Sequence, residues 1–154
     1  EGLHRSLQMA AREQVMLAVE IMDTPYINSI RRFRELKEHL PSPWLTVYPD
    51  IGNLSAWGND ISSELELGRP DIVAMHLKDT HAVTEKHEGT FRDVPFGSGC
   101  VDFVRAFEVL HGMGYRGPFV IEMWTEKAPD PEREIARSRE WLLERMKEGG
   151  LLCQ

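Results

Sequence analysis

Four short apolar runs recur along the chain, and each contains or ends in a residue that can bind a hard metal ion. The runs are Leu17–Asp23, Trp44–Asp50, Ile72–Asp79 and Phe119–Trp124. Because they are apolar on both faces, they are typical of strands buried in a parallel sheet. The pattern predicts four strands, at residues 16–22, 44–49, 71–78 and 119–124.

Segments with the period of a helix separate these strands, and capping residues, prolines and glycines bound them. The predicted helices cover residues 2–13, from 28 or 29 to about 40, from 59 or 60 to 67, 101–113, and from 130 to about 147. The polar stretch from Asp79 to Asp93 has no clear period and is predicted to be a long loop. Loops of that length in a compact domain are usually functional lids or disordered insertions.

Alternation of strands with helices predicts an α/β fold with a parallel sheet, in a single domain over residues 1–154. Four such units are half of an eight-unit barrel, which takes about 250 residues when complete. Four parallel strands would leave two edges without a partner strand. We therefore expect a partner to complete the sheet: a second copy of the chain, a missing N-terminal half, or a swapped neighbour.

The net charge of −7 argues against binding to nucleic acid or to an anionic membrane through bulk electrostatics. No apolar run approaches the roughly 20 residues that a membrane-spanning helix needs. The two cysteines, Cys100 and Cys153, match no zinc-binding spacing and suit a reducing cytosol. We expect Cys100 to be a small buried residue and Cys153 to be a loose C-terminal thiol.

Each strand contributes one candidate metal ligand: Glu20, Asp50, His76 and Glu122. Taken singly, Glu20 could pair with an arginine, Asp50 could cap the loop that follows, His76 could be a core histidine, and Glu122 could be an edge-strand charge. Four ionisable groups on four buried strands are costly unless they share a purpose. A single divalent cation offsets that cost for all of them, and this ligand set suits Mn²⁺, Mg²⁺, Co²⁺ or Zn²⁺.

A bound cation of this kind can polarise a carbonyl group and stabilise an enediolate. Two of the carboxylates could also act as bases, if Glu20 and Glu122 face opposite sides of a bound sugar. One would take a proton from the carbon beside the carbonyl, and the other would return a proton to the far face. The site chemistry therefore favours an epimerisation without a redox cofactor.

Five segments in this order resemble the L-ribulose-5-phosphate 3-epimerases, also called L-xylulose-5-phosphate 3-epimerases and, in some cases, hexulose-6-phosphate isomerases. The segments are Ala18–Pro25, Tyr48–Trp57, His76–Thr80, Val94–Gly99 and Ile121–Trp124. The resemblance implies a xylose-isomerase-like TIM barrel, of which this chain is the C-terminal half. It also implies a metal-dependent epimerase in the cytoplasm that acts on a ketopentose 5-phosphate in pentose phosphate catabolism.

The resemblance implies a single divalent metal ion held by Glu20, Asp50, His76 and Glu122, with Glu20 and Glu122 as the catalytic acid and base. Asn53 stands where some related ketose 3-epimerases have a substrate-contacting histidine, which fits the branch that acts on phosphorylated sugars.

Four further residues are candidate substrate contacts. Gly97 and Gly99 could present backbone N–H groups to a phosphate, although a tight turn explains them as well. Lys78 could orient the phosphate or the metal ligands, or it could pair with Asp79 or another carboxylate. Trp124 could shape the sugar pocket or pack on the barrel rim.

Two alternative functions use the same residues. The first is an aldose–ketose isomerase that moves a proton between C1 and C2 of a sugar phosphate. The second is a truncated half-barrel that binds metal but has no turnover of its own. The expected partners are a small sugar phosphate and either a second copy of the chain or the missing N-terminal half, with no nucleic acid and no membrane.

Overall fold

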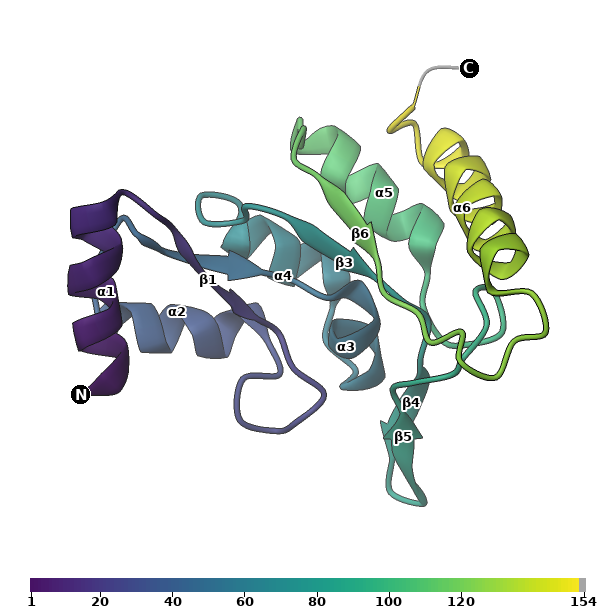
Figure 1. Ribbon diagram of the computed structural model, residues 1–154, viewed down its shortest axis with the longest axis horizontal. Coiled ribbons are helices and arrows are strands. Elements are labelled where there is room, and N and C mark those ends of the chain that lie inside the picture. Colours follow the sequence, from purple (N-terminus) through teal and green to yellow (C-terminus); the bar gives the residue numbers. More distant parts are fainter. Residues whose placement is uncertain (153–154) are drawn as a thin grey trace.

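The computed structural model describes residues 1–152 and consists of parallel strands that alternate with helices (Figure 1). In chain order the elements are α1 (Gly2–Glu13), β1 (Leu17–Glu20), α2 (Ile30–His39), β2 (Leu45–Tyr48), α3 (Ile51–Ala56), α4 (Ile61–Gly68), β3 (Met75–Leu77), β4 (His81–Thr84), β5 (His87–Thr90), α5 (Phe103–Gly112), β6 (Phe119–Ile121) and α6 (Pro131–Glu148).

The predicted helix starts are confirmed at three carboxylate or hydroxyl caps. Ser29, Asp60 and Asp130 each accept a hydrogen bond from the backbone N–H three residues later, at the start of α2, α4 and α6. Such a side chain satisfies an N–H group that has no partner within its helix. Helix α5 is also capped, by Asp102, which accepts a hydrogen bond from the N–H of Arg105. This helix begins at Phe103, two residues after the predicted start at residue 101.

The parallel strands lie in the spatial order β1-β2-β3-β6. β1 pairs with β2 from Leu17↔Leu45 onward, and β3 pairs with β6 from Met75↔Phe119 onward. Parallel bridges from Val47 to Ile72 and from Asp50 to His76 join the two pairs. Within residues 1–152 the outer edges of β1 and β6 have no partner strand, and the sheet does not close. The prediction of half a barrel is therefore confirmed.

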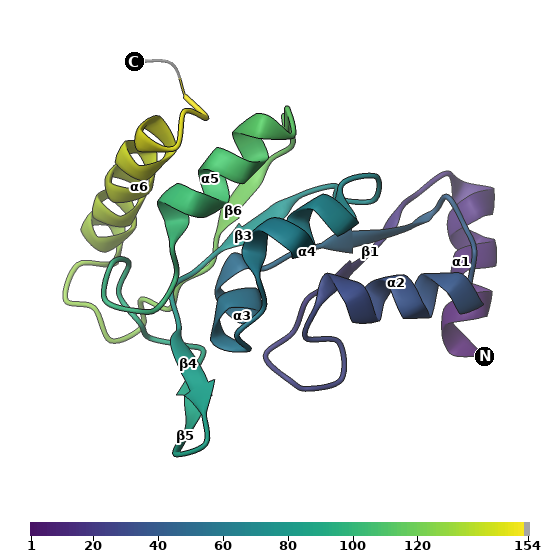
Figure 2. The same cartoon turned by 180° about the vertical axis from the view of Figure 1, so that it is seen from behind.

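Helices cover one face of this sheet, as the view from behind makes plain (Figure 2). Leu45, Val47, Met75 and Leu77 point to that face and are fully buried in the core. Alternate residues of a strand point to the opposite face, where Val120 remains 43% exposed. The uncovered face is the one that faces the inside of a complete barrel, and it carries the ionisable residues of the strands.

The prediction of a long loop over residues 79–93 is wrong in its middle part, which forms the antiparallel hairpin β4–β5. The hairpin projects away from the helices (Figure 1). His81 pairs with Thr90 and Val83 pairs with Glu88, around a turn at Glu85 and Lys86. Because both faces of this ribbon are polar or half-buried, the sequence lacks the alternation that identifies a strand.

The short helix α3, directly after Asp50, was not predicted. It has six residues and includes Gly52 and Asn53, so it is too short to show a helical period. Cys100 is exposed rather than buried, so that prediction is wrong, and Cys153 lies outside the described residues. Among residues 1–152, no helix combines the length and the apolar character needed to cross a membrane.

Candidate metal centre

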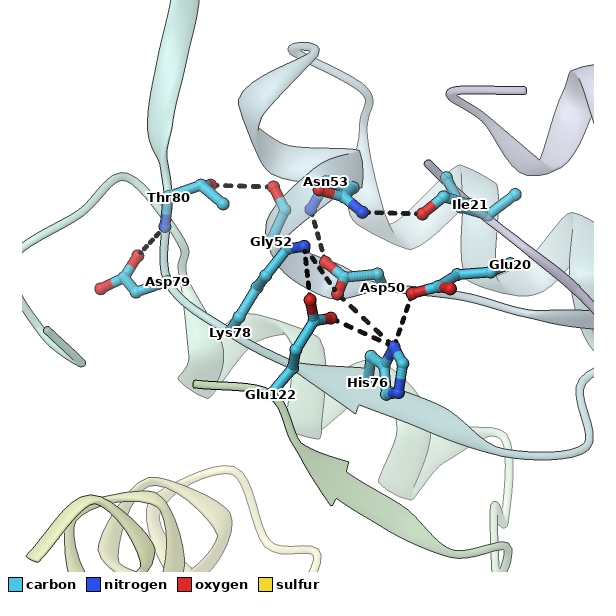
Figure 3. Close-up of polar contacts among 10 residues, drawn as sticks. All are labelled: Glu20, Ile21, Asp50, Gly52, Asn53, His76, Lys78, Asp79, Thr80 and Glu122. Atoms are coloured by element: carbon cyan, nitrogen blue, oxygen red, sulfur yellow. Dashed lines mark hydrogen bonds and ion pairs between the residues drawn. The ribbon is translucent and has the colours of Figure 1, made fainter. Parts of the chain in front are cut away.

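The four predicted ligands meet at one end of the parallel strands (Figure 3). Glu20 ends β1, Asp50 follows β2, His76 lies within β3, and Glu122 follows β6. One ligand atom from each residue lies within 4.8 Å of the ligand atoms of the other three. The parallel register produces this meeting, because the N–H of His76 bonds to the carbonyl of Pro49 and the N–H of Glu122 to that of Leu77.

The imidazole of His76 directs its Nδ1 atom toward the three carboxylates. Nδ1 lies 2.7 Å from Oε1 of Glu20, 3.3 Å from Oε2 of Glu122 and 3.9 Å from Oδ2 of Asp50. Two of these oxygens, Oδ2 of Asp50 and Oε2 of Glu122, are buried and have no hydrogen-bond partner among residues 1–152. Buried polar atoms rarely lack a partner. Oxygen and imidazole donors that converge in this way fit a divalent cation.

Asp50 both caps the segment that follows it and faces the cluster. Its Oδ1 atom accepts the N–H of Asn53 at 2.6 Å and so caps α3, while Oδ2 faces the cluster. Burial raises the pKa of Asp50 to about 8, and the nearby Glu122 adds to the rise. The Lys78 ammonium and the hydrogen bond from the N–H of Asn53 each lower the pKa of Asp50, but they offset only part of the rise. Without a cation, the buried carboxyl of Asp50 therefore tends to hold a proton at neutral pH.

Sequence reasoning missed Tyr48, whose ring centroid lies 4.2 Å from that of His76. Burial raises the pKa of this phenol, and the negative charges of Glu20, Asp50 and Glu122 raise it further. Tyr48 is the register partner of Glu20 in the neighbouring strand. Directly paired residues of parallel strands point to the same face, but the sequence alone does not give this register, so nothing in it singled out Tyr48.

Lys78 places a buried cation beside the cluster. Its side chain is 6% exposed, and Nζ lies 3.3 Å from Oε1 of Glu122 and 3.6 Å from Oδ2 of Asp50. The ammonium also lies 5.6 Å from the ring centroid of Trp124, on which the guanidinium of Arg92 stacks at 5.3 Å. Lys78 therefore pairs with the carboxylates of Asp50 and Glu122 rather than with that of Asp79.

The Asp79 side chain engages the backbone N–H groups of Gly97 and Gly99, the two glycines considered above for phosphate binding or a tight turn. Both donate to Oδ2 of Asp79 at 2.9 Å, and Val101 donates to Oδ1 at 3.3 Å. A Cβ atom on Gly99 would lie 2.1 Å from Oδ1, so the backbone approaches this carboxylate more closely than any other residue type allows. Asp79 lies within the segment His76–Thr80, but nothing in the sequence indicates that it binds these N–H groups.

Asn53 is buried close to the cluster, at 2% exposure. Its Nδ2 atom donates to the carbonyl of Ile21 at 2.8 Å, while Oδ1 accepts no hydrogen bond from the part of the chain that the structure describes. A cavity of about 250 Å³ opens beside the cluster, large enough for a small molecule. Its lining includes Lys78, Phe96, Glu122, Trp124, Lys127 and Ser138.

An acidic cluster with one histidine at the end of parallel βα units defines a class of barrel proteins whose site lies at the C-terminal ends of the strands. The sequence model of the xylose isomerase-like TIM barrel family matches residues 1–145, and the chain belongs to this family.

Curated relatives carry more specific names. The chain is 59% identical to a putative L-ribulose-5-phosphate 3-epimerase of Escherichia coli, SgbU, over 99% of this chain and 54% of that protein. It is 51% identical to an L-ribulose-5-phosphate 3-epimerase of Escherichia coli, UlaE, over 99% of this chain and 51% of that protein. These relatives confirm the resemblance found in the sequence, and the chain spans about half of their length.

Solved structures share the fold at much lower sequence identity. An L-ribulose 3-epimerase superposes with a TM-score of 0.73 at 16% identity, over 96% of this chain and 52% of that chain. A xylose isomerase domain protein from Alicyclobacillus acidocaldarius superposes with a TM-score of 0.77 at 19% identity, over 96% of this chain and 56% of that chain. These matches establish the half-barrel arrangement.

Proposed function

We propose that this chain carries the metal centre and both catalytic carboxylates of a 3-epimerase that acts on a ketopentose 5-phosphate, interconverting L-ribulose 5-phosphate and L-xylulose 5-phosphate. The observation that carries the proposal is the meeting of Glu20, Asp50, His76 and Glu122 within 4.8 Å. The substrate class is supported by the names of the curated relatives.

Glu20, Asp50, His76 and Glu122 would hold one divalent ion, and Mn²⁺, Zn²⁺, Co²⁺ and Mg²⁺ all suit the donor set. The buried oxygens Oδ2 of Asp50 and Oε2 of Glu122, which have no hydrogen-bond partner in the described chain, support this assignment. When bound, the ion supplies positive charge that stabilises the negative charge developing on the sugar oxygens.

Two carboxylates are accessible enough to move protons. The side chains of Glu20 and Glu122 are 35% and 25% exposed, whereas Asp50 is fully buried. In a 2-ketose the C3 hydrogen is acidified by the neighbouring carbonyl group. One glutamate removes that proton to form an enediolate, and the other returns a proton to the opposite face of C3. Their positions on the outer strands β1 and β6 support opposite approaches to the sugar.

The sugar would occupy the cavity beside Glu122. Trp124 lines this cavity and offers an apolar surface for the carbon chain. Asn53 would accept a hydrogen bond from a sugar hydroxyl through Oδ1, which has no partner within the described residues. The phosphate is not assigned to Gly97 and Gly99, because Asp79 accepts from both N–H groups.

We further propose that a second half-barrel completes the sheet, either the N-terminal half or a second copy of the chain. The free edges of β1 and β6 and the exposure of Val120 support this, as does the chain's coverage of about half of its relatives. A half-barrel that binds metal without turnover is the second candidate, favoured by the same free edges. The cytoplasmic location stays a prediction of the resemblance.

The test uses a full-length chimera in which this chain replaces the matching part of the Escherichia coli SgbU relative. L-ribulose 5-phosphate is incubated with the Mn²⁺-loaded chimera in D₂O and followed by NMR. We expect deuterium at C3 and formation of L-xylulose 5-phosphate. Deuterium at C1 together with an aldose product would instead indicate the isomerase. Mn²⁺ binding by the chain without exchange in the chimera would indicate a half-barrel that lacks turnover.

A further inference from the structure

Lys78 is a buried ammonium group beside the cluster, and the proposed proton transfers do not use it. It contacts two of the three carboxylates, Asp50 and Glu122, and both contacts come from one Nζ atom (Figure 3). Three carboxylates within 4.8 Å of one another repel strongly when they are ionised. A cation among them reduces that repulsion whether or not a metal ion is present.

The protein makes room for this side chain at one position of α3. A Cβ atom on Gly52 would lie 2.6 Å from the carbonyl oxygen of Lys78 and 2.7 Å from its Cγ atom. Glycine within a helix is less favourable than alanine by about 1 kcal/mol. The close approach of the Lys78 stem explains why a glycine is placed there, two residues after Asp50, which caps the helix.

Lys78 is poorly placed to bind a substrate. Its Nζ atom faces Asp50 and Glu122, and its side chain is 6% exposed. The ring of Trp124 flanks the ammonium on a further side. An incoming phosphate would have to draw the ammonium away from the fully buried Asp50 and the partly buried Glu122, and both contacts would be lost.

We propose that Lys78 is an internal counter-cation that holds Asp50 and Glu122 in place before the metal ion binds and then competes with that ion for their charge. This inference rests on the metal site of the proposed function. Lys78 is thus a positioning residue, which acts through the two carboxylates. Since two positive centres repel each other, the arrangement keeps the metal-free site ordered and weakens metal binding.

The test compares charge removal with charge retention at this position. Lys78→Met and Lys78→Gln remove the charge at similar length, and Lys78→Arg keeps it. The matched control is Lys127→Met, because Lys127 lines the same cavity and pairs with Asp93 at 3.1 Å, with its side chain 88% exposed. For each metal-free chain, the melting temperature is recorded and Mn²⁺ is titrated by calorimetry at pH 7.

We expect both neutral variants to melt at a lower temperature without metal and to bind Mn²⁺ at least about tenfold more tightly than the unmodified chain. Lys78→Arg should stay close to the unmodified chain in both measurements, and Lys127→Met should change neither. If Lys78→Met does not fold without metal, Lys78→Gln, which keeps hydrogen-bond donors, supplies the comparison.

Equal or weaker Mn²⁺ binding by the neutral variants would overturn the inference while leaving the metal site intact. If neither the unmodified chain nor the variants bind Mn²⁺, the metal site and the inference both fail. Tighter binding by the neutral variants together with an inactive chimera would support the role of Lys78 and refute the epimerase. The two proposals therefore fail in different ways.

Discussion

Asp50 and His76 are joined twice, once by their backbones and once by their side chains. A parallel bridge connects the two residues, and Oδ2 of Asp50 lies 3.9 Å from Nδ1 of His76. The other oxygen of Asp50 caps α3. One buried carboxylate therefore links the sheet, a helix start and the proposed metal centre, so a change in its charge should affect both stability and metal binding.

The stability of the metal-free chain should fall as the pH rises from about 4 to about 8. The pKa of the Asp50 carboxyl is raised from 3.8 to about 8 in the folded chain. Between these values the folded state holds a proton that the unfolded state has released, so raising the pH favours unfolding. The stability that comes from the protonated group is complete below pH 4 and is lost by about pH 8, with a slope of up to about 1.4 kcal/mol per pH unit.

Denaturant titrations at several pH values measure this slope. Asp50→Asn should flatten the profile, because the amide does not titrate, and saturating Mn²⁺ should flatten it as well. If the unfolding free energy of Asp50→Asn falls with pH as steeply as that of the unmodified chain, a group other than Asp50 causes the pH dependence. Asp60→Asn is the matched control, since Asp60 also caps a helix but lies at the surface.

Glu122→Gln in the chimera should lower the rate of C3 exchange by a factor of about 100 or more, because a general base is lost while its volume is kept. Circular dichroism should show an unchanged fold. Glu126→Gln, an exposed neighbour beyond the strand, serves as the control and should retain full activity. Exchange at the original rate in Glu122→Gln would refute the catalytic role of this carboxylate.

The sequence predicted the cluster of Glu20, Asp50, His76 and Glu122 because each stands out as an ionisable residue on an apolar run, and parallel strands bring such positions together. It could not identify Asp79, whose importance lies in the N–H groups of Gly97 and Gly99, which follow it after the hairpin insertion. The short helix that Asp50 caps and the hairpin were missed for a related reason. Both are local structures that tertiary contacts stabilise without a periodic pattern.

Gly99→Ala should destabilise the chain by about 2 kcal/mol or more, because the new methyl group would overlap the Asp79 carboxylate and break its N–H contacts. Urea denaturation measures the loss. Gly112→Ala is the matched control, since a Cβ atom there meets nothing within 4 Å and the residue ends α5. Equal stability of the two variants would show that the Asp79 contacts do not hold the loop.

The isolated chain should self-associate, because the edges of β1 and β6 carry no partner strand from the described residues and apolar residues beside them are exposed. Val15, Met16 and Val120 are 54%, 56% and 43% exposed. Light scattering coupled to gel filtration measures the mass. A single species at 17.7 kDa over a range of concentrations would contradict this expectation.

The most direct test of the metal centre is a crystal structure grown with Mn²⁺, with anomalous diffraction used to locate the ion. We expect one strong peak among Glu20, Asp50, His76 and Glu122, with one oxygen or nitrogen of each at coordination distance. If the crystals show these four side chains turned away from one another, with anomalous signal elsewhere or nowhere, the convergence of donors is not a metal site and the proposed chemistry has no basis.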